Sequence, residues 1–175
     1  MTNNHLITPE DVHELARNSS AQLDPRDVST YIEEAEQLDL KPSLGTALYL
    51  RLLNNTGDEQ ANRTLLYGGS YTTCCGDMAM FAGVRKALAY YVYGRIVKNG
   101  GRTATRFGFV EKRDEYSYQV DYKERINIAN DATLVADSYM KETLNYIEST
   151  GLYPEYKSCH GGMRNRRVTI KAIGE

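Results

Sequence analysis

The sequence predicts a mainly α-helical fold: a compact bundle of about five helices, with a long basic and aromatic loop, a small β-hairpin and an extended C-terminal arm. Apolar residues recur at helical spacing over most of the first 150 positions, with an interruption at residues 99–121. At 175 residues, 41% of them hydrophobic, the chain can bury one substantial core. We therefore expect residues 1–150 to form one helical domain that includes the 99–121 loop, and residues 151–175 to form the arm.

The first two helices are marked by their start signals. Thr8-Pro9 and Asp24-Pro25 each place a proline directly after a helix-capping residue, which predicts helices that begin near residues 9 and 25. The first helix is short and ends at about Ala16.

The second helix has an acidic side and a proline at its expected end. Glu33, Glu34 and Glu36 lie opposite its apolar residues and are interpreted as a solvated face. Pro42 is expected to end the helix before Lys41, because the residue that precedes a proline disfavours helical geometry.

Three shorter elements follow. Helical spacing predicts helices over residues 44–53 and 58–67, the second stopped by Gly68-Gly69. Residues 70–81 read as a small β-hairpin with its turn at Gly76.

Two longer segments carry the strongest helical pattern. Residues 83–98 are apolar on nearly every side, which is typical of a helix packed on several faces. Residues 121–150 form the other helix, with an acidic start at Asp121 and Glu124 and a stop at Gly151. Two adjacent apolar stripes predict that this helix is also central.

The insert between these helices, Asn99–Tyr122, is the most distinctive segment. Unstructured loops of this length are uncommon inside compact domains and are usually functional or disordered. Basic and aromatic residues alternate through it, a composition suited to holding a partner. The residues expected at this interface are Arg102, Arg106, Phe107, Phe109, Lys112, Arg113, Tyr116 and Tyr118.

The arm ends in a segment that resembles a single strand. Residues 168–173 alternate in polarity, and one strand alone is unstable in water, so it needs an edge in this subunit or in a neighbouring one. The arm residues expected to make contacts are Tyr153, Tyr156, Arg164, Arg166, Arg167, Val168 and Ile170.

Charge is distributed unevenly along the chain. Residues 1–60 hold eleven acidic and four basic residues, whereas residues 95–113 hold six basic residues and one acidic residue. Residues 151–175 hold five basic and two acidic residues. Segments of opposite sign suit head-to-tail association of identical subunits, or pairing within one chain.

No pattern predicts an enzyme, a cofactor or a metal. Cys74, Cys75, Cys159 and His160 are the right types for zinc, but adjacent ligands are awkward around one tetrahedral ion, and inert reduced thiols are the simpler reading. No histidine has a nucleophile context, and the paired glycines lack the spacing of phosphate-binding loops. No secretory signal or membrane-length apolar run is present, which predicts a protein that is soluble where it is made.

A sequence-independent nucleic-acid binder is the alternative function. The glutamates of the second helix disfavour a helix-turn-helix that approaches phosphates. Such a protein would instead use the basic loop and tail: Arg102, Arg106, Lys112, Arg113, Arg164, Arg166 and Arg167.

Three stretches carry a family resemblance. YIEEAEQLDLKPSLG (31–45), GVRKALAYYVYGRIV (83–97) and TRFGFVEK (105–112) resemble the head-tail connector, or adaptor, proteins of tailed bacteriophages, particularly phages of Bacteroides-type bacteria. By segment order the resemblance spans residues 28–147.

The resemblance implies a structural virion protein. Members of that family assemble as a ring, usually of twelve copies, beneath the portal protein, where the ring extends the channel for double-stranded DNA and presents a surface for the tail. It implies residence at the portal vertex, with assembly in the host cytoplasm. In such rings the loop between the last two long helices and the C-terminal arm reach neighbouring subunits or the portal, which here are residues 102–118 and 151–175.

Overall fold

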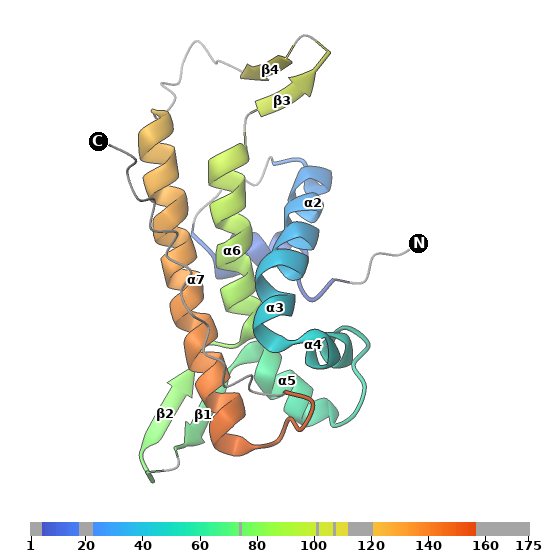
Figure 1. Ribbon diagram of the computed structural model, residues 1–175, viewed down its shortest axis with the longest axis vertical. Helices are drawn as coiled ribbons and strands as arrows, with labels where there is room; N and C mark the ends of the chain where they lie inside the picture. The colour runs from blue at the N-terminus through green and yellow to red at the C-terminus, as the bar shows by residue number, and fades with distance from the viewer. Residues whose placement is uncertain are drawn as a thin grey trace, which may run out of the picture.

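Helix α6 is the axis on which the rest of the molecule packs (Figure 1). Helices α1, α2, α5 and α7 all contact it, and its buried residues lie on several faces. The prediction of a helix packed on several sides is therefore confirmed.

The computed structural model describes residues 5–17, 23–73, 75–100, 102–106, 108–111 and 121–156. The prediction of a mainly α-helical fold is confirmed. The elements are α1 (Pro9–Leu15), α2 (Pro25–Ala35), the π-helical turn η1 (Glu36–Leu40), α3 (Lys41–Leu44), α4 (Thr46–Leu53), α5 (Glu59–Tyr67), β1 (Gly69–Thr72), β2 (Met78–Phe81), α6 (Val84–Asn99), β3 (Arg102–Thr105), β4 (Gly108–Glu111) and α7 (Tyr122–Thr150). No described helix is long and apolar enough to cross a membrane.

The predicted helix starts are confirmed at both prolines. Thr8 and Asp11 form a reciprocal capping box, in which each side chain accepts a hydrogen bond from the backbone N–H of the other. The Asp24 carboxylate accepts from Arg26 N at 2.9 Å and caps α2. Local capping chemistry thus sets both starts.

The expectation that Pro42 ends the second helix is wrong. Lys41 keeps helical torsions (φ −59°, ψ −40°), and the chain continues from α2 through η1 into α3. A proline inside a helix lacks a donor and its ring crowds the carbonyl one turn earlier. The wider π turn just before Pro42 relieves this conflict, and the helix ends instead at Gly45, whose φ is +80°.

Glu36 is buried, so the solvated acidic face is a wrong prediction at this position. The residue is 1% exposed, and its carboxylate accepts hydrogen bonds from His5 Nδ1 at 2.9 Å and Leu6 N at 2.8 Å. Tyr49 Oη donates to it at 3.3 Å. Burial, and after it the Glu36 charge, raise the pKa of Tyr49 to about 12. The carboxylate therefore ties the N-terminal segment to the helical body.

Helix α7 lies at the side of the molecule, so the prediction that it is central is wrong, although every residue of its two predicted apolar stripes is buried or partly buried. It packs on α6 and β2, whereas its outer side is solvated and Leu134 is 67% exposed. Its predicted ends are confirmed: the Asp121 side chain accepts from Lys123 N, and Gly151 adopts the left-handed conformation that ends many helices.

The predicted hairpin at residues 70–81 is confirmed as β1 and β2. The strands pair antiparallel from Gly69 opposite Phe81 to Thr72 opposite Met78. Gly68 and Gly83 pass each other at its base: a Cβ on Gly68 would lie 2.5 Å from the Phe81 carbonyl oxygen. The inner face of the hairpin packs on the α7 side chain Tyr146, with which the Phe81 ring stacks at 4.1 Å between centroids.

The first residues of the predicted arm belong to the folded body. Tyr153 is 3% exposed and donates a hydrogen bond from its hydroxyl to the Ala61 carbonyl at 2.8 Å. Glu155 pairs with Arg51 at 2.9 Å. The packed structure thus continues through residue 156, and residues 157–175, with the predicted strand at 168–173, lie outside the described part.

Candidate functional site

The insert between α6 and α7 contains a β-hairpin, which corrects the expectation of a loop without regular structure. Strands β3 and β4 pair antiparallel, with Arg102 opposite Glu111 and Thr105 opposite Gly108. The physical reason lies in the sequence: strand-forming threonines at 103 and 105 precede Arg106-Phe107, strand-forming Phe109-Val110 follow, and glycine at 108 eases the turn between them. The segment therefore has a defined backbone where a partner could pair or pack.

The hairpin extends beyond the ends of the two long helices (Figure 1). Helices α6 and α7 run antiparallel, so β3 and β4 lie at one end of the pair and the β1–β2 hairpin lies at the other. The 29 residues of α7 correspond to a length of about 44 Å. The molecule thus carries a hairpin at each end of an elongated helical body.

Arg125 holds the base of this hairpin. Its guanidinium donates hydrogen bonds to the carbonyls of Gly100 at 2.6 Å, Val97 at 3.3 Å and Lys98 at 3.4 Å. These carbonyls belong to the C-terminal end of α6, where helix carbonyls lack partners within the helix and the dipole favours a cation. An α7 side chain therefore fixes the point at which the chain leaves α6 for β3.

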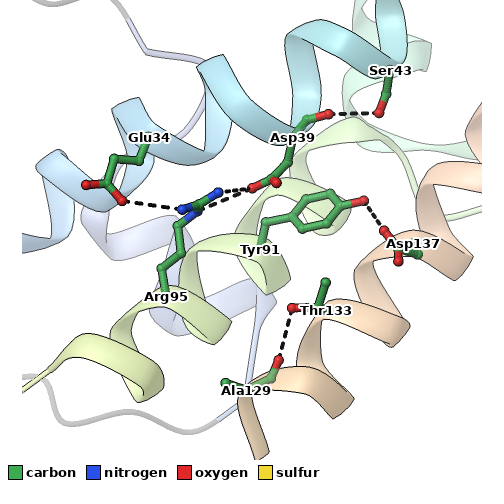
Figure 2. A network of polar contacts seen from close by, with 8 residues as sticks. All are labelled: Glu34, Asp39, Ser43, Tyr91, Arg95, Ala129, Thr133 and Asp137. Carbon is green, nitrogen blue, oxygen red and sulfur yellow. Dashed lines mark hydrogen bonds and ion pairs between the residues drawn. The ribbon is translucent and has the colours of Figure 1, made fainter. Parts of the chain in front are cut away.

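A polar network braces the helices beneath the hairpin, as Figure 2 shows. Arg95 on α6 donates to Asp39 Oδ2 at 2.7 and 3.2 Å and to Glu34 at 3.4 Å. Tyr91, one turn earlier, donates to Asp137 on α7 at 2.6 Å. Burial, and after it the Asp137 contact, raise the pKa of Tyr91 well above its usual value. The network joins α2 and η1 to α6, and α6 to α7.

The brace also depends on a close approach between α6 and α7. A Cβ on Gly94 would lie 3.2 Å from the Ala129 carbonyl oxygen and 3.3 Å from Thr133 Oγ1. Thr133 returns its hydroxyl hydrogen to the Ala129 carbonyl at 3.0 Å, within its own helix. Because Gly94 has no side chain, the α6 backbone can approach the Ala129 carbonyl and the Thr133 side chain of α7 closely.

The predicted interface residues fall into three groups: those in the β3–β4 hairpin, those in the folded body, and those outside the described residues. Arg106 is exposed at the turn, and Arg102 and Phe109 belong to the paired strands. Tyr153 is buried in its own subunit, which corrects its assignment to an extended arm, and Tyr156 packs partly against the core. The remaining predicted positions lie outside the described residues: Phe107, Lys112, Arg113, Tyr116, Tyr118, Arg164, Arg166, Arg167, Val168 and Ile170.

Sequence reasoning did not identify Arg125, Arg95 or Asp39 as supports of this surface. No local signal marks Arg125: it lies near the N-terminus of its own helix, where the dipole does not favour a cation, and its target is a helix end 25 residues earlier in the chain. Such long-range pairs are set by packing and leave no local pattern.

The part of the chain that the structure describes holds no assembled metal site. No group of three or more histidine, cysteine or acidic side chains is placed there to hold a metal. Cys75 is exposed, whereas Cys74, Cys159 and His160 fall among the undescribed positions. An open cleft of about 280 Å³ includes Arg51, but Glu155 and Asn62 already accept hydrogen bonds from that guanidinium.

The chain matches a known protein family. The profile of a family of unknown function (DUF6712) matches residues 40–166, which include α3 to α7 and the β3–β4 hairpin. No curated protein and no solved structure matches the chain.

Proposed function

We propose that this chain, which belongs to the family of unknown function DUF6712, is a structural subunit of a phage head-tail connector ring. In this proposal, about twelve copies dock beneath the portal, extend the channel for double-stranded DNA and offer the attachment surface for the tail. The observation that carries the proposal is the β3–β4 hairpin, which extends from the helical body while Arg125 fixes its base.

The hairpin suits a contact between subunits or with the portal. It reaches beyond the two helices that hold it, so it offers backbone edges that a neighbour can approach. Its sequence neighbourhood is basic, and the N-terminal segment that folds into α1 to α4 is acidic. Repeated copies would bring surfaces of opposite sign together, and multivalency would offset weak single contacts.

The segments that resemble connector proteins form one structural unit. Residues 31–45 fold as the end of α2, η1 and α3, and residues 83–97 form most of α6. Arg95 and Asp39 join these two segments, and residues 105–112 include β4. The resemblance therefore coincides with the brace and with the hairpin above it, which supports the proposal.

A binding experiment with charge-reversed variants tests the proposal. The full chain is mixed with the portal protein of the same virus, and complexes are measured by native mass spectrometry. We expect a complex with several copies per portal, weakened at least about tenfold by Arg102→Glu with Arg106→Glu, because each reversal replaces attraction with repulsion. Lys123→Glu with Lys141→Glu, on exposed positions of α7, is the matched control and should bind as the natural chain does. A chain that never associates with the portal would contradict the proposal.

A sequence-independent nucleic-acid binder is the second candidate, favoured by the exposed Arg106 at the hairpin turn and the basic residues around it. Phosphate contacts predict an affinity that falls steeply with salt, and a log-log slope that decreases by about one for each contact removed. Filter binding to random double-stranded DNA measures this directly. Tight DNA binding without portal binding would favour this candidate over the connector.

A further inference from the structure

The β1–β2 hairpin is covered on one face only. Tyr71 and Phe81 turn toward α7, where their ring centroids lie 5.2 Å and 4.1 Å from that of Tyr146. On the opposite face Met78 is 80% exposed and Met80 is 79% exposed. Two strands alone are marginally stable, and a pair of bare methionines beside a strand edge is typical of a surface that another segment covers.

The outer edge of β2 is open. Figure 1 shows β2 on the far side of β1 from α5, with none of the described elements beyond it. Among the residues that the structure describes, the backbone hydrogen bonds of β2 go to β1. An unpaired edge of this kind accepts an added strand through main-chain hydrogen bonds.

The described chain ends next to this hairpin. The Tyr153 ring centroid lies 6.0 Å from that of Tyr146, the same residue on which Phe81 and Tyr71 pack. Hydrogen bonding of the Tyr153 hydroxyl to Ala61 and pairing of Glu155 with Arg51 hold residues 153–155 at this end of α7. Residues 153–155 therefore lie at the same end of α7 as the β1–β2 hairpin, against α4 and α5.

The tail is long enough to reach the nearer of the two hairpins. Eleven residues separate Tyr156 from the alternating segment 168–173, and they span at most about 40 Å when extended. The β1–β2 hairpin lies well within that reach. The β3–β4 hairpin of the same chain lies beyond the far end of α7, a helix about 44 Å long, and is the more distant of the two.

We propose that residues 168–173 of the same chain add to the outer edge of β2 as a third strand and place one row of their side chains beside Met78 and Met80. The segment has the alternation and β-branched residues of a strand, with Val168, Ile170 and Ala172 on one side. Attachment through a short linker gives a high effective concentration, which favours pairing within the chain over pairing with a neighbour. Pairing would place Arg164, Arg166 and Arg167 near this end, so that both ends of the helical body carry basic residues. This inference does not depend on the proposed function.

Disulfide scanning on the isolated full-length chain tests the pairing. In a background with Cys74, Cys75 and Cys159 changed to serine, Met80→Cys is combined in turn with a cysteine at each position from 168 to 173. We expect a disulfide within one chain at alternate positions only, because successive strand residues point to opposite faces. Asn130→Cys, exposed on α7, replaces Met80→Cys in the control series and should give no alternation.

Three results would overturn the proposal: equal yields at all six positions, no disulfide with Met80→Cys, or disulfides that join two chains. Hydrogen exchange supplies a second measurement that needs no cysteine. Truncation after Arg167 should accelerate exchange of β2 amides at least about tenfold, whereas removal of Glu175 alone should leave it unchanged. Equal β2 exchange in the truncated and full chains would also overturn it.

Discussion

Glu36 is a single residue that determines how the N-terminal segment is held. Its buried carboxylate satisfies a backbone N–H, a histidine and a tyrosine hydroxyl drawn from the N-terminal segment and α4. A carboxylate in such a position is costly to bury and contributes stability only while its donors stay in place. Glu33 lies only three residues before Glu36 in the same sequence, yet Glu33 is exposed.

Replacing Glu36 tests this difference. We expect Glu36→Ala to lower the free energy of unfolding by about 2–4 kcal/mol, because Leu6 N–H and the Tyr49 hydroxyl lose their acceptor. Glu33→Ala, the control, should change it by less than about 0.5 kcal/mol. Urea denaturation followed by circular dichroism measures both, and equal losses would show that the buried contacts add no stability.

Asp11 predicts how stability depends on pH. Burial on its own raises the pKa of Asp11, but the hydrogen bonds from Thr8 and the Arg85 guanidinium together lower it below its usual value. A carboxyl with a lowered folded-state pKa stabilises the fold above its unfolded pKa, about 4, and this contribution is lost as pH falls below that value. Asp11→Asn should therefore lower stability at pH 7 and flatten its decline between about pH 5 and 2. Thermal unfolding across that range measures the effect, and a decline as steep as in the natural chain would contradict it.

At the scale of elements, the sequence predicts the helix starts and ends that depend on capping residues and glycines nearby in the chain. Capping residues mark the starts of α1, α2 and α7, and glycines mark the ends of α5 and α7. The π turn before Pro42 has no such signal, because it depends on how the whole segment packs against α6. Two short strand-forming segments on either side of Arg106-Phe107 indicate the β3–β4 hairpin. The basic and aromatic composition of the same residues also favours a binding loop, and that loop is what the sequence analysis predicts.

Pro42 provides a test of the π turn. If η1 accommodates the proline, Pro42→Ala should change the free energy of unfolding by less than about 1 kcal/mol, since no strain remains to be relieved. Asn130→Pro, at an exposed position inside α7, should cost about 3 kcal/mol or more. Denaturation midpoints compare the two variants, and a large gain from Pro42→Ala would mean that the helix is strained at this point.

Replacing Arg125 tests whether its hydrogen bonds to the end of α6 stabilise the β3–β4 hairpin. Arg125→Ala should leave the helix content unchanged and lower stability by about 1–2 kcal/mol, because three carbonyls lose a charged donor. Amides from Gly100 through β4 should exchange faster, while those in the middle of α6 should not. Lys123→Ala, in the same turn of α7, serves as control, and exchange that rises equally in both variants would contradict the role of Arg125.

At the scale of the molecule, packing explains what pattern alone did not. Two apolar stripes led to the prediction that α7 is central. Every residue of both stripes is buried or partly buried, but together they make only one side of a helix whose other side is solvated. A body braced by Arg95, Asp39 and Tyr91, with hairpins at both ends, suits a subunit whose role is to hold partners in register.

The connector proposal is tested most directly by cryo-electron microscopy of the full chain mixed with the portal protein of its virus. The account predicts a closed ring on the portal, with β3 and β4 of each copy contacting a neighbouring copy or the portal. Particles in which the portal remains bare while the chain stays monomeric would contradict it.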